Sequence, residues 1–162
     1  MDEEFGRFVA ARGRALCRTA YLLTGDWQAG EDLVQEALTR SYLRRRRLRS
    51  PAALEPYARK VLVTLFLSSR RRLWHRELPF ADVPEQAANG QLDAVEDRSG
   101  LWSALLALSS QQRAVLVLRY FEDLTEADIA AVLDCSPGAV KTHAARGLAR
   151  LRKSMELEGW TR

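Results

Sequence analysis

Basic and polar side chains follow the outer face of a helix predicted near the C-terminus, from Ser136 to Lys153. This face carries Lys141, Thr142, Arg146, Ala149, Arg150, Arg152 and Lys153, with His143 at its flank. The cationic groups suit the phosphates of a duplex, whereas Thr142 and Arg146 are placed to reach base edges in the major groove. A surface helix with solvated charges is the alternative interpretation, because charge runs often do no more than face water. The rest of the chain has to decide between the two.

A helix-turn-helix pattern is predicted to position this face. Thr125 is an N-cap candidate, with Asp128 three residues later as in a partial capping box, and the apolar residues that follow recur at helical spacing. Residues 133–135 form a short predicted turn. Ser136 then supplies a second N-cap, and Pro137 suits the first position of the next helix. Two short helices joined by about three residues fit a helix-turn-helix.

A second candidate surface lies on a long helix predicted from about Pro56 to His75. Its predicted buried face holds Tyr57, Val61, Leu62, Leu65 and Phe66, while Val63 and Leu67 are left near the boundary. Towards its end, arginines surround Trp74, a combination that suits melted or single-stranded nucleic acid, because Arg meets phosphates and Trp stacks on an unpaired base. Packing of Trp74 against the preceding helices is an equally good interpretation of the residues alone.

The helix predicted from about Trp27 to Arg47 also has a polar outer face, formed by Asp32, Gln35, Glu36, Thr39 and Arg40. Small Thr39 beside carboxylates and an arginine is compatible with a protein-docking surface. A solvated face with a Glu36–Arg40 pair at i,i+4, contributing only tenths of a kcal/mol, is the interpretation that the residues alone favour.

The charge is distributed in three blocks along the 162 residues. Residues 1–76 hold 16 Lys/Arg against 8 Asp/Glu, residues 77–135 hold 3 against 11, and residues 136–162 hold 6 against 2. Two basic regions flanking an acidic one suit two separate contacts with a polyanion. The stretch 77–100 has weak periodicity, two prolines and six acids to one arginine, so it is a predicted flexible linker and domain boundary.

After this linker, a C-terminal module of four helices is predicted. Leu101–Leu108 forms a short apolar helix, and Ser109 with Gln112 matches a capping box for the next one. Within that helix, the side chains expected to face the core are Val115, Leu118 and Phe121.

Several classes of protein are excluded or disfavoured by the sequence. The longest uncharged run, residues 61–69, is too short to cross a bilayer, and the acidic N-terminus is not a secretory signal. Cys17 and Cys135 lie far apart, which favours reduced, buried thiols over a disulfide or a metal site. His75 and His143 have no evident catalytic partners, and no nucleotide-binding, zinc-protease or serine-hydrolase motif is present. We therefore expect no enzyme, no cofactor and no small-molecule substrate.

Four segments in order resemble a known family over nearly the whole chain. They are EDLVQEALTR at 31–40, YARKVLVTLFLSSRRR at 57–72, QQRAVLVLRYFEDLTEADIAAVL at 111–133, and GAVKTHAARGLARLR from Gly138. The chain resembles the extracytoplasmic-function (ECF) branch of the sigma-70 family, in particular its SigE-like members. The fold expected is all-α, with two small helical domains joined by a flexible acidic linker and a C-terminal helix-turn-helix of the winged-helix-like, sigma region 4 type.

The resemblance implies a cytoplasmic initiation subunit that binds core RNA polymerase and directs it to promoters. It assigns residues 1–76 to sigma region 2, 77–100 to the linker and 101–162 to sigma region 4. It also assigns the contacts with core polymerase to Asp32, Gln35 and Glu36. This assignment reverses the interpretation that the residues alone favour, in which this polar face is only solvated. Minus-ten contacts fall to Lys60, Thr64, Leu67, Arg70, Arg71 and Trp74. Contacts with the minus-thirty-five element fall to Ser136, Lys141, Thr142, His143, Arg146 and Arg150. Its partners are core RNA polymerase and promoter DNA, an anti-sigma factor is left open, and no direct membrane insertion is expected.

Three positions depart from the usual pattern of the family. Asparagine is usual where Thr64 stands, which leaves the details of minus-ten readout open. Glycine is usual at Asp134, but Asp tolerates the left-handed conformation better than most residues, so the turn is expected to survive. Ala139 replaces a threonine whose hydroxyl could have reached DNA.

The chain ends at Arg162, soon after the DNA-binding helix, and we expect no regulatory extension there. The rival hypothesis is an autonomous helix-turn-helix regulator, which leaves the polar helix and the Arg/Trp helix without a purpose.

Overall fold

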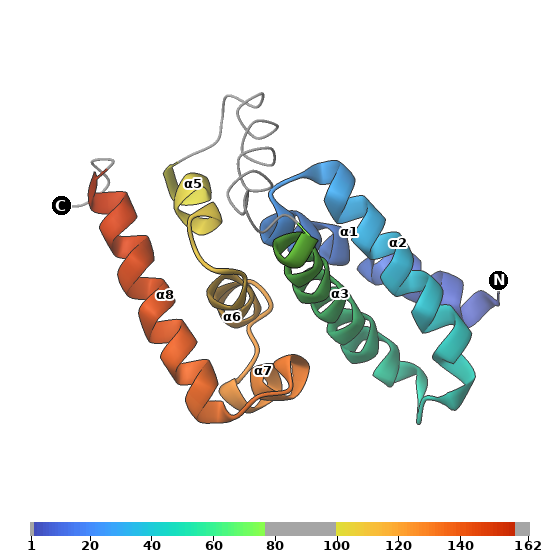
Figure 1. Ribbon diagram of the computed structural model, residues 1–162. Helices are drawn as coiled ribbons and strands as arrows, with labels where there is room; N and C mark the ends of the chain where they lie inside the picture. Colours follow the sequence, from blue (N-terminus) through green and yellow to red (C-terminus); the bar gives the residue numbers. More distant parts are fainter. Residues whose placement is uncertain (1, 77–99, 158–162) are drawn as a thin grey trace.

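A computed structural model describes residues 2–76 and 100–157, and all of its regular structure in these ranges is helical. Figure 1 shows their arrangement. The elements are α1 (Glu3–Thr24), α2 (Trp27–Arg44), the short 3-10 turns η1 (Arg45–Arg47) and η2 (Pro51–Ala53), α3 (Leu54–Arg76), α5 (Gly100–Leu106), α6 (Ser110–Tyr120), α7 (Glu126–Leu133) and α8 (Pro137–Leu157). We call residues 2–76 the N-terminal half and residues 100–157 the C-terminal half. Except for Gly100, which begins α5, the predicted linker lies outside the described residues.

Local signals set the ends of α1 and α2. Asp2 caps α1 by accepting a hydrogen bond from the Phe5 backbone N–H, and Gly25 ends it with φ 75°, a left-handed conformation that suits glycine. Asp26 then caps α2 through the Gln28 N–H. The two helices approach closely at Gly30, where an added Cβ would lie 3.3 Å from the Tyr21 backbone nitrogen. The run predicted as one helix to Arg47 tightens into η1 after Arg44.

The expected capping signals of the C-terminal half are confirmed. Ser109 and Gln112 form a reciprocal capping box at the start of α6. Val115 and Leu118 are fully buried, as expected, but the prediction for Phe121 is wrong, because its side chain is 58% exposed. Phe121 directly follows α6, and its side chain lines a surface hollow together with Leu22 and Trp27 instead of entering the core.

One hydrophobic core joins the two halves. Leu23, Val63 and Phe66 of the N-terminal half belong to the same buried cluster as the apolar residues of α5, α6, α7 and α8. The expectation that Val63 lies near a boundary is therefore wrong: it is fully buried, because the C-terminal half covers the side of α3 that an isolated domain would expose. In Figure 1, α6 stands between α8 on one side and α1 and α3 on the other. The described chain is thus in a closed arrangement.

A buried arginine crosses the contact between the halves. Arg113 on α6 is fully buried, and its guanidinium donates to the backbone carbonyl of Leu23 at the end of α1, with a nitrogen–oxygen distance of 2.6 Å. The same side chain donates to the carbonyls of Leu105, Leu106 and Leu108 at 3.1, 3.3 and 3.2 Å. Five N–H donors in a planar fork allow one residue to satisfy carbonyls on several segments. Arg113 therefore ties α5 and its following turn to α6 and to the N-terminal half.

Candidate nucleic-acid interface

The helix-turn-helix is present with the caps expected from the sequence. The Thr125 side chain accepts from the Asp128 N–H at the start of α7, and Ser136 Oγ accepts from the Ala139 N–H at 3.0 Å at the start of α8. Between them Asp134 has φ 56° and ψ 51°, the left-handed conformation that the turn requires. The Asp134 departure is therefore accommodated, because Asp is among the few residues that visit this region readily.

Helix α8 presents its polar face to solvent because its apolar face is held against the C-terminal half. Val140 is fully buried and Ala144 is 6% exposed. Buried Gly147 lets α8 approach α6, where a Cβ would lie 3.2 Å from Leu116 Cδ1. The opposite face is the one expected to meet DNA: exposed on it are Ser136, Lys141, Thr142, Arg146 and Arg150, with His143 half-buried at the flank.

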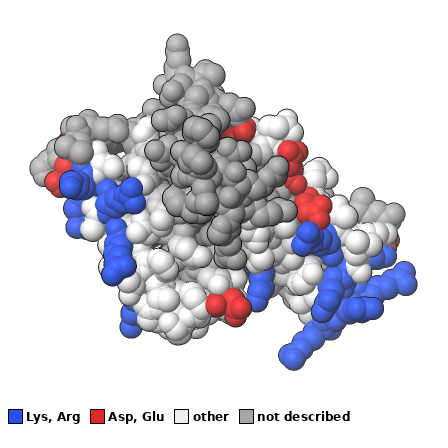
Figure 2. Space-filling view, viewed as in Figure 1, with Lys and Arg blue, Asp and Glu red and all other residues white. Residues whose placement is uncertain are grey.

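On this face, Thr142 makes a local hydrogen bond and Lys141 makes a long ion pair with α7. Thr142 Oγ1 donates to the Gly138 carbonyl at 3.1 Å, so its remaining capacity is to accept from a ligand. Lys141 Nζ lies 4.0 Å from Glu126 Oε1, and its side chain is 69% exposed, so a phosphate can replace that contact at little cost. Figure 2 shows Lys and Arg side chains gathered along α8 at one side of the molecule and around the end of α2 at the other.

The minus-ten candidates share one stripe of α3. Positions 60, 64, 67, 71 and 74 are three or four residues apart, the spacing of helix neighbours, with position 70 beside them. Thr64 is exposed, and half-buried Arg70 lies with its guanidinium carbon 5.9 Å from the centre of the Phe66 ring. For Arg71 and Trp74 the structure describes only the helical backbone, so the choice between stacking and packing for Trp74 lies outside the described side chains.

One member of the stripe contacts the C-terminal half, and another packs against the core that the two halves share. Lys60 Nζ donates to the Ala131 carbonyl of α7 at 3.1 Å. Leu67 is half-buried and packs against the shared core. In the closed arrangement, part of the surface that the family resemblance assigns to DNA is therefore already in contact with other residues of the chain.

The polar face of α2 is open. Asp32, Gln35 and Glu36 are all exposed. Asp32 Oδ1 accepts from Gln28 Nε2 at 3.1 Å, and the expected Glu36–Arg40 pair is formed at 2.7 Å with both side chains about half-exposed. Hollows of about 390 and 410 Å³ lie on the two sides of this face, the first lined in part by Asp32 and Glu36, the second in part by Gln35.

The part of the chain that the structure describes holds neither a metal-binding cluster nor a membrane-spanning helix. Within residues 2–76 and 100–157 no group of three or more His, Cys, Asp or Glu side chains is placed to hold a metal ion. No helix in that part of the chain is long and apolar enough to span a membrane. Arg113 and the ion pair between Arg59 of α3 and Glu122 after α6 connect the two halves. These roles could not be predicted from the sequence, because nothing in the spacing of the three residues separates them from solvated charges.

This geometry defines an all-helical protein with a capped helix-turn-helix and a second exposed polar face, and comparison with known proteins gives its family. Residues 8–76 match the family Sigma-70 region 2, and residues 98–151 match Sigma-70, region 4. The RNA polymerase sigma-E factor of Streptomyces coelicolor is 33% identical over 156 residues, covering 94% of this chain and 86% of the relative. The ECF RNA polymerase sigma factor SigL of Mycobacterium tuberculosis is 31% identical over 158 residues, covering 91% and 86%.

The fold is similar to that of a solved sigma factor. The structure of RpoE in complex with the anti-sigma factor NepR from Bartonella quintana matches with a TM-score of 0.74 and 22% identity, covering 96% of this chain and 98% of that one. The chain belongs to the sigma-70 family and is an ECF-type RNA polymerase sigma factor. Members of this family are transcription initiation factors and not classical enzymes. Matches in both halves disfavour the autonomous helix-turn-helix regulator.

Proposed function

We propose that the two halves of this sigma factor divide the promoter between them. The C-terminal domain, 101–162, reads the minus-thirty-five element with the exposed face of α8, through Ser136, Lys141, Thr142, His143, Arg146 and Arg150. The N-terminal domain, 1–76, reads the minus-ten element with α3, through Lys60, Thr64, Leu67, Arg70, Arg71 and Trp74. Residues 77–100 connect the two. The observation that supports this division best is the capped helix-turn-helix, which turns the basic face of α8 to solvent.

Core RNA polymerase is proposed to dock on α2 through Asp32, Gln35 and Glu36. Their exposure in the closed arrangement supports this assignment. Docking on polymerase also supplies specificity that phosphate contacts lack, because holding both modules on one enzyme raises the effective concentration of the second promoter contact. The protein is proposed to act in the cytoplasm without catalysis of its own, and an anti-sigma factor is a candidate partner because the structural neighbour is described with one.

Arg146 provides the test of upstream reading. With core polymerase and a cognate promoter, Arg146→Ala is expected to lose roughly 1–3 kcal/mol of promoter binding if Arg146 contacts a base edge in bidentate fashion. The loss should disappear on promoters already altered at the contacted base pair. Arg152→Ala is the matched control, because Arg152 is exposed on the same basic face but outside the proposed set, so any loss from it should be the same on every upstream sequence. An equal loss on every upstream sequence would show a phosphate contact instead.

The docking proposal is tested by the double variant Asp32→Ala, Gln35→Ala. We expect weaker binding to core polymerase with an unchanged far-ultraviolet circular dichroism spectrum, since both side chains are exposed. Glu31→Ala, which removes a neighbouring exposed carboxylate outside the proposed set, controls for net charge. Unchanged polymerase binding by the double variant would reject the assignment.

A further inference from the structure

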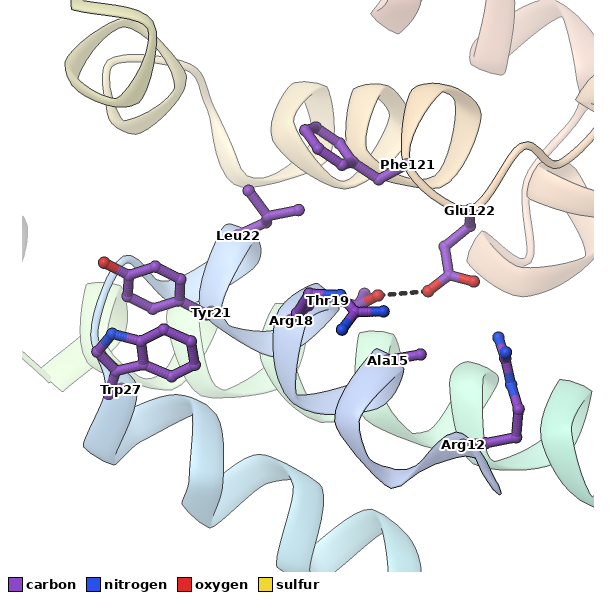
Figure 3. Close-up of a pocket in the computed structure, with 9 residues that line it drawn as sticks. All are labelled: Arg12, Ala15, Arg18, Thr19, Tyr21, Leu22, Trp27, Phe121 and Glu122. Atoms are coloured by element: carbon purple, nitrogen blue, oxygen red, sulfur yellow. Dashed lines mark hydrogen bonds between the residues drawn. The ribbon is translucent and has the colours of Figure 1, made fainter. Parts of the chain in front are cut away.

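A hollow of about 440 Å³ lies between α1 and the residues that directly follow α6, and Figure 3 shows the side chains around it. One side is a face of α1, whose lining residues at three- or four-residue steps are Arg12, Ala15, Thr19 and Leu22. The other side is formed by Phe121 and Glu122. Small-molecule sites in proteins have volumes of about 300–1,000 Å³, with mostly apolar walls and a few polar groups. The hollow therefore has the size of a small-molecule site.

Aromatic rings line one end of the hollow. The rings of Tyr21 and Trp27 are stacked, with their centroids 3.8 Å apart and their planes 7° apart. Figure 3 shows this pair at the end of the hollow away from Arg12. Trp27 is still 50% exposed, so the face of its indole that Tyr21 does not cover is open, and Phe121 of the other half is 58% exposed. Open ring faces of this kind are surfaces on which a planar aromatic group can stack.

The carboxylates at the opposite end are already paired with arginines. Glu122 accepts a hydrogen bond from Arg59 Nε at 3.2 Å. Glu55 lies 2.6 Å from a terminal nitrogen of Arg12 and 3.4 Å from one of Arg59. These two arginines and two carboxylates balance each other in charge, so any further cation at the hollow is left to attract an anion.

Arg18 is that further cation. It lines the hollow, it is exposed, and it forms no ion pair with an Asp or Glu of residues 2–76 and 100–157. It precedes Tyr21 by three residues, about one helix turn or 5 Å along the axis. Arg12 adds a second donor, because its Nε is buried and has no hydrogen-bond partner in the part of the chain that the structure describes. A buried donor without an acceptor is unfavourable, so an anion beside Arg18 that draws the Arg12 guanidinium towards it relieves this cost.

We propose that this hollow binds a planar aromatic anion of the size of a purine nucleoside monophosphate. The ring system stacks on the open face of Trp27, with Phe121 on the other side of the hollow, and the phosphate is bound by Arg18, whose planar guanidinium suits bidentate contacts with phosphate. Arg18 and Trp27 belong to the N-terminal half and Phe121 to the C-terminal half, so the ligand contacts both. None of these residues is assigned to promoter or polymerase, and the inference does not depend on those contacts.

A second hollow nearby has to be distinguished from this one. It has a volume of about 580 Å³ and lies along α1 and α2, and Arg18 and Trp27 line it too. Trp27 is its one ring among the described residues, and Phe121 is not part of it. The first hollow is the better site for an aromatic anion, because it combines the Arg18 cation with rings from both halves. Arg14 lines the second hollow alone and allows the two to be separated by experiment.

Isothermal titration calorimetry of the full chain tests the site with three probes. Adenosine 5′-monophosphate carries both the ring system and the phosphate, adenosine carries the ring system without phosphate, and ribose 5-phosphate carries the phosphate without the ring system. We expect adenosine 5′-monophosphate to bind about tenfold more tightly than either of the other two, because stacking and a charged hydrogen bond each contribute a change of this order. Equal affinity for adenosine 5′-monophosphate and ribose 5-phosphate would show attraction of charge alone and would overturn the proposal, as would no binding of adenosine 5′-monophosphate.

Variants then assign each contact to its residue. Arg18→Ala should weaken binding of adenosine 5′-monophosphate about tenfold and leave binding of adenosine unchanged. Trp27→Ala should weaken binding of both and leave binding of ribose 5-phosphate unchanged. Phe121→Ala should weaken binding of adenosine 5′-monophosphate as well. All three side chains are exposed, so the circular dichroism spectra and melting temperatures of the ligand-free variants should match the parent chain.

Arg14→Ala is the matched control, because Arg14 is exposed on the same helix, carries the same charge and lines only the second hollow. Its affinity for adenosine 5′-monophosphate should equal that of the parent chain. A loss in Arg14→Ala as large as that in Arg18→Ala, with Phe121→Ala unchanged, would place the ligand in the second hollow and overturn the proposal.

Two further measurements separate a free ligand from a nucleic-acid strand. Because the ligand binds the folded chain, adenosine 5′-monophosphate should raise the melting temperature of the parent chain by mass action, and should raise that of Phe121→Ala less. A single-stranded oligonucleotide without terminal phosphates should bind the parent chain and Arg18→Ala with the same affinity. A loss of oligonucleotide binding in Arg18→Ala as large as the loss of adenosine 5′-monophosphate binding would make the hollow a contact for nucleic acid and overturn the proposal.

Discussion

Replacement of Arg113 by alanine is expected to be among the most destabilising single changes in this protein. The guanidinium is fully buried and donates to four backbone carbonyls at 2.6 to 3.3 Å, on Leu23, Leu105, Leu106 and Leu108. Alanine leaves these acceptors without their donor and opens a space the size of the lost side chain. Leaving one buried acceptor unsatisfied costs about 1–3 kcal/mol, so the loss for four of them is a large fraction of the total stability of about 5–15 kcal/mol for a protein of ordinary size.

Urea unfolding followed by far-ultraviolet circular dichroism measures the loss. With a denaturant slope of about 2 kcal/mol per molar, a loss of about 4 kcal/mol from the four unsatisfied acceptors lowers the midpoint by about 2 M. Arg113→Lys should lie between the parent and Arg113→Ala, because lysine keeps the charge but lacks the planar fork. Arg150→Ala, at an exposed position on α8, should stay within about 0.5 kcal/mol of the parent. A midpoint shift below about 0.5 M for Arg113→Ala, equivalent to about 1 kcal/mol on the same slope, would refute the reasoning.

The structure also predicts the direction of three smaller effects, at two glycines of α1 and α2, at the Asp2 carboxyl and at the Cys17 thiol. Gly30→Ala should lower the melting temperature, because its Cβ would lie 3.3 Å from a backbone nitrogen of α1. Gly6→Ala, with nothing within 4 Å of its Cβ, should instead raise the stability by about 0.5–1 kcal/mol through helix propensity. The opposite order of the two melting temperatures would contradict the close packing of α1 and α2. The Arg45 guanidinium, and then the Phe5 N–H, hold the pKa of Asp2 below its ordinary value. The ionised carboxylate therefore stabilises the fold above the ordinary pKa, and this stabilisation is lost as the pH falls through the lowered pKa. Melting temperatures measured in acid should accordingly depend less on pH for Asp2→Asn than for the parent chain. Burial, and then the negative charge of Glu31, raise the pKa of the Cys17 thiol. In a Cys135→Ser chain at pH 8, alkylation of Cys17 by iodoacetamide, measured by mass spectrometry, should therefore be slower in the folded protein than in urea. Alkylation of the folded protein should be faster in Glu31→Gln than with Glu31 present, and equal rates in all three samples would argue against both causes.

Structural features that depend only on neighbours along the chain could be predicted from the amino-acid sequence. Helix caps are such features: Thr125, Ser136 and the Ser109–Gln112 box were readable because a cap needs only its own side chain and the N–H groups within three residues. The left-handed turn at Asp134 was readable for the same reason. The outward basic face of α8 followed from periodicity, since Val140 and Ala144 fix which side is buried. The candidate DNA-reading surface on α8 was therefore largely accessible to sequence reasoning.

The contact between the two halves could not be predicted in this way, because it joins residues that are far apart in the chain. The pattern of α3 shows that it is apolar on one side, but it cannot show that Val63 is buried by a segment far along the chain. Arg113 has the type and spacing of an ordinary helix arginine until four carbonyls from three segments converge on it. Glu122 and Arg59 are 63 residues apart, and a carboxylate carries no mark of the distant cation that it will meet. Such contacts depend on where the chain returns in space, which periodicity and capping do not encode.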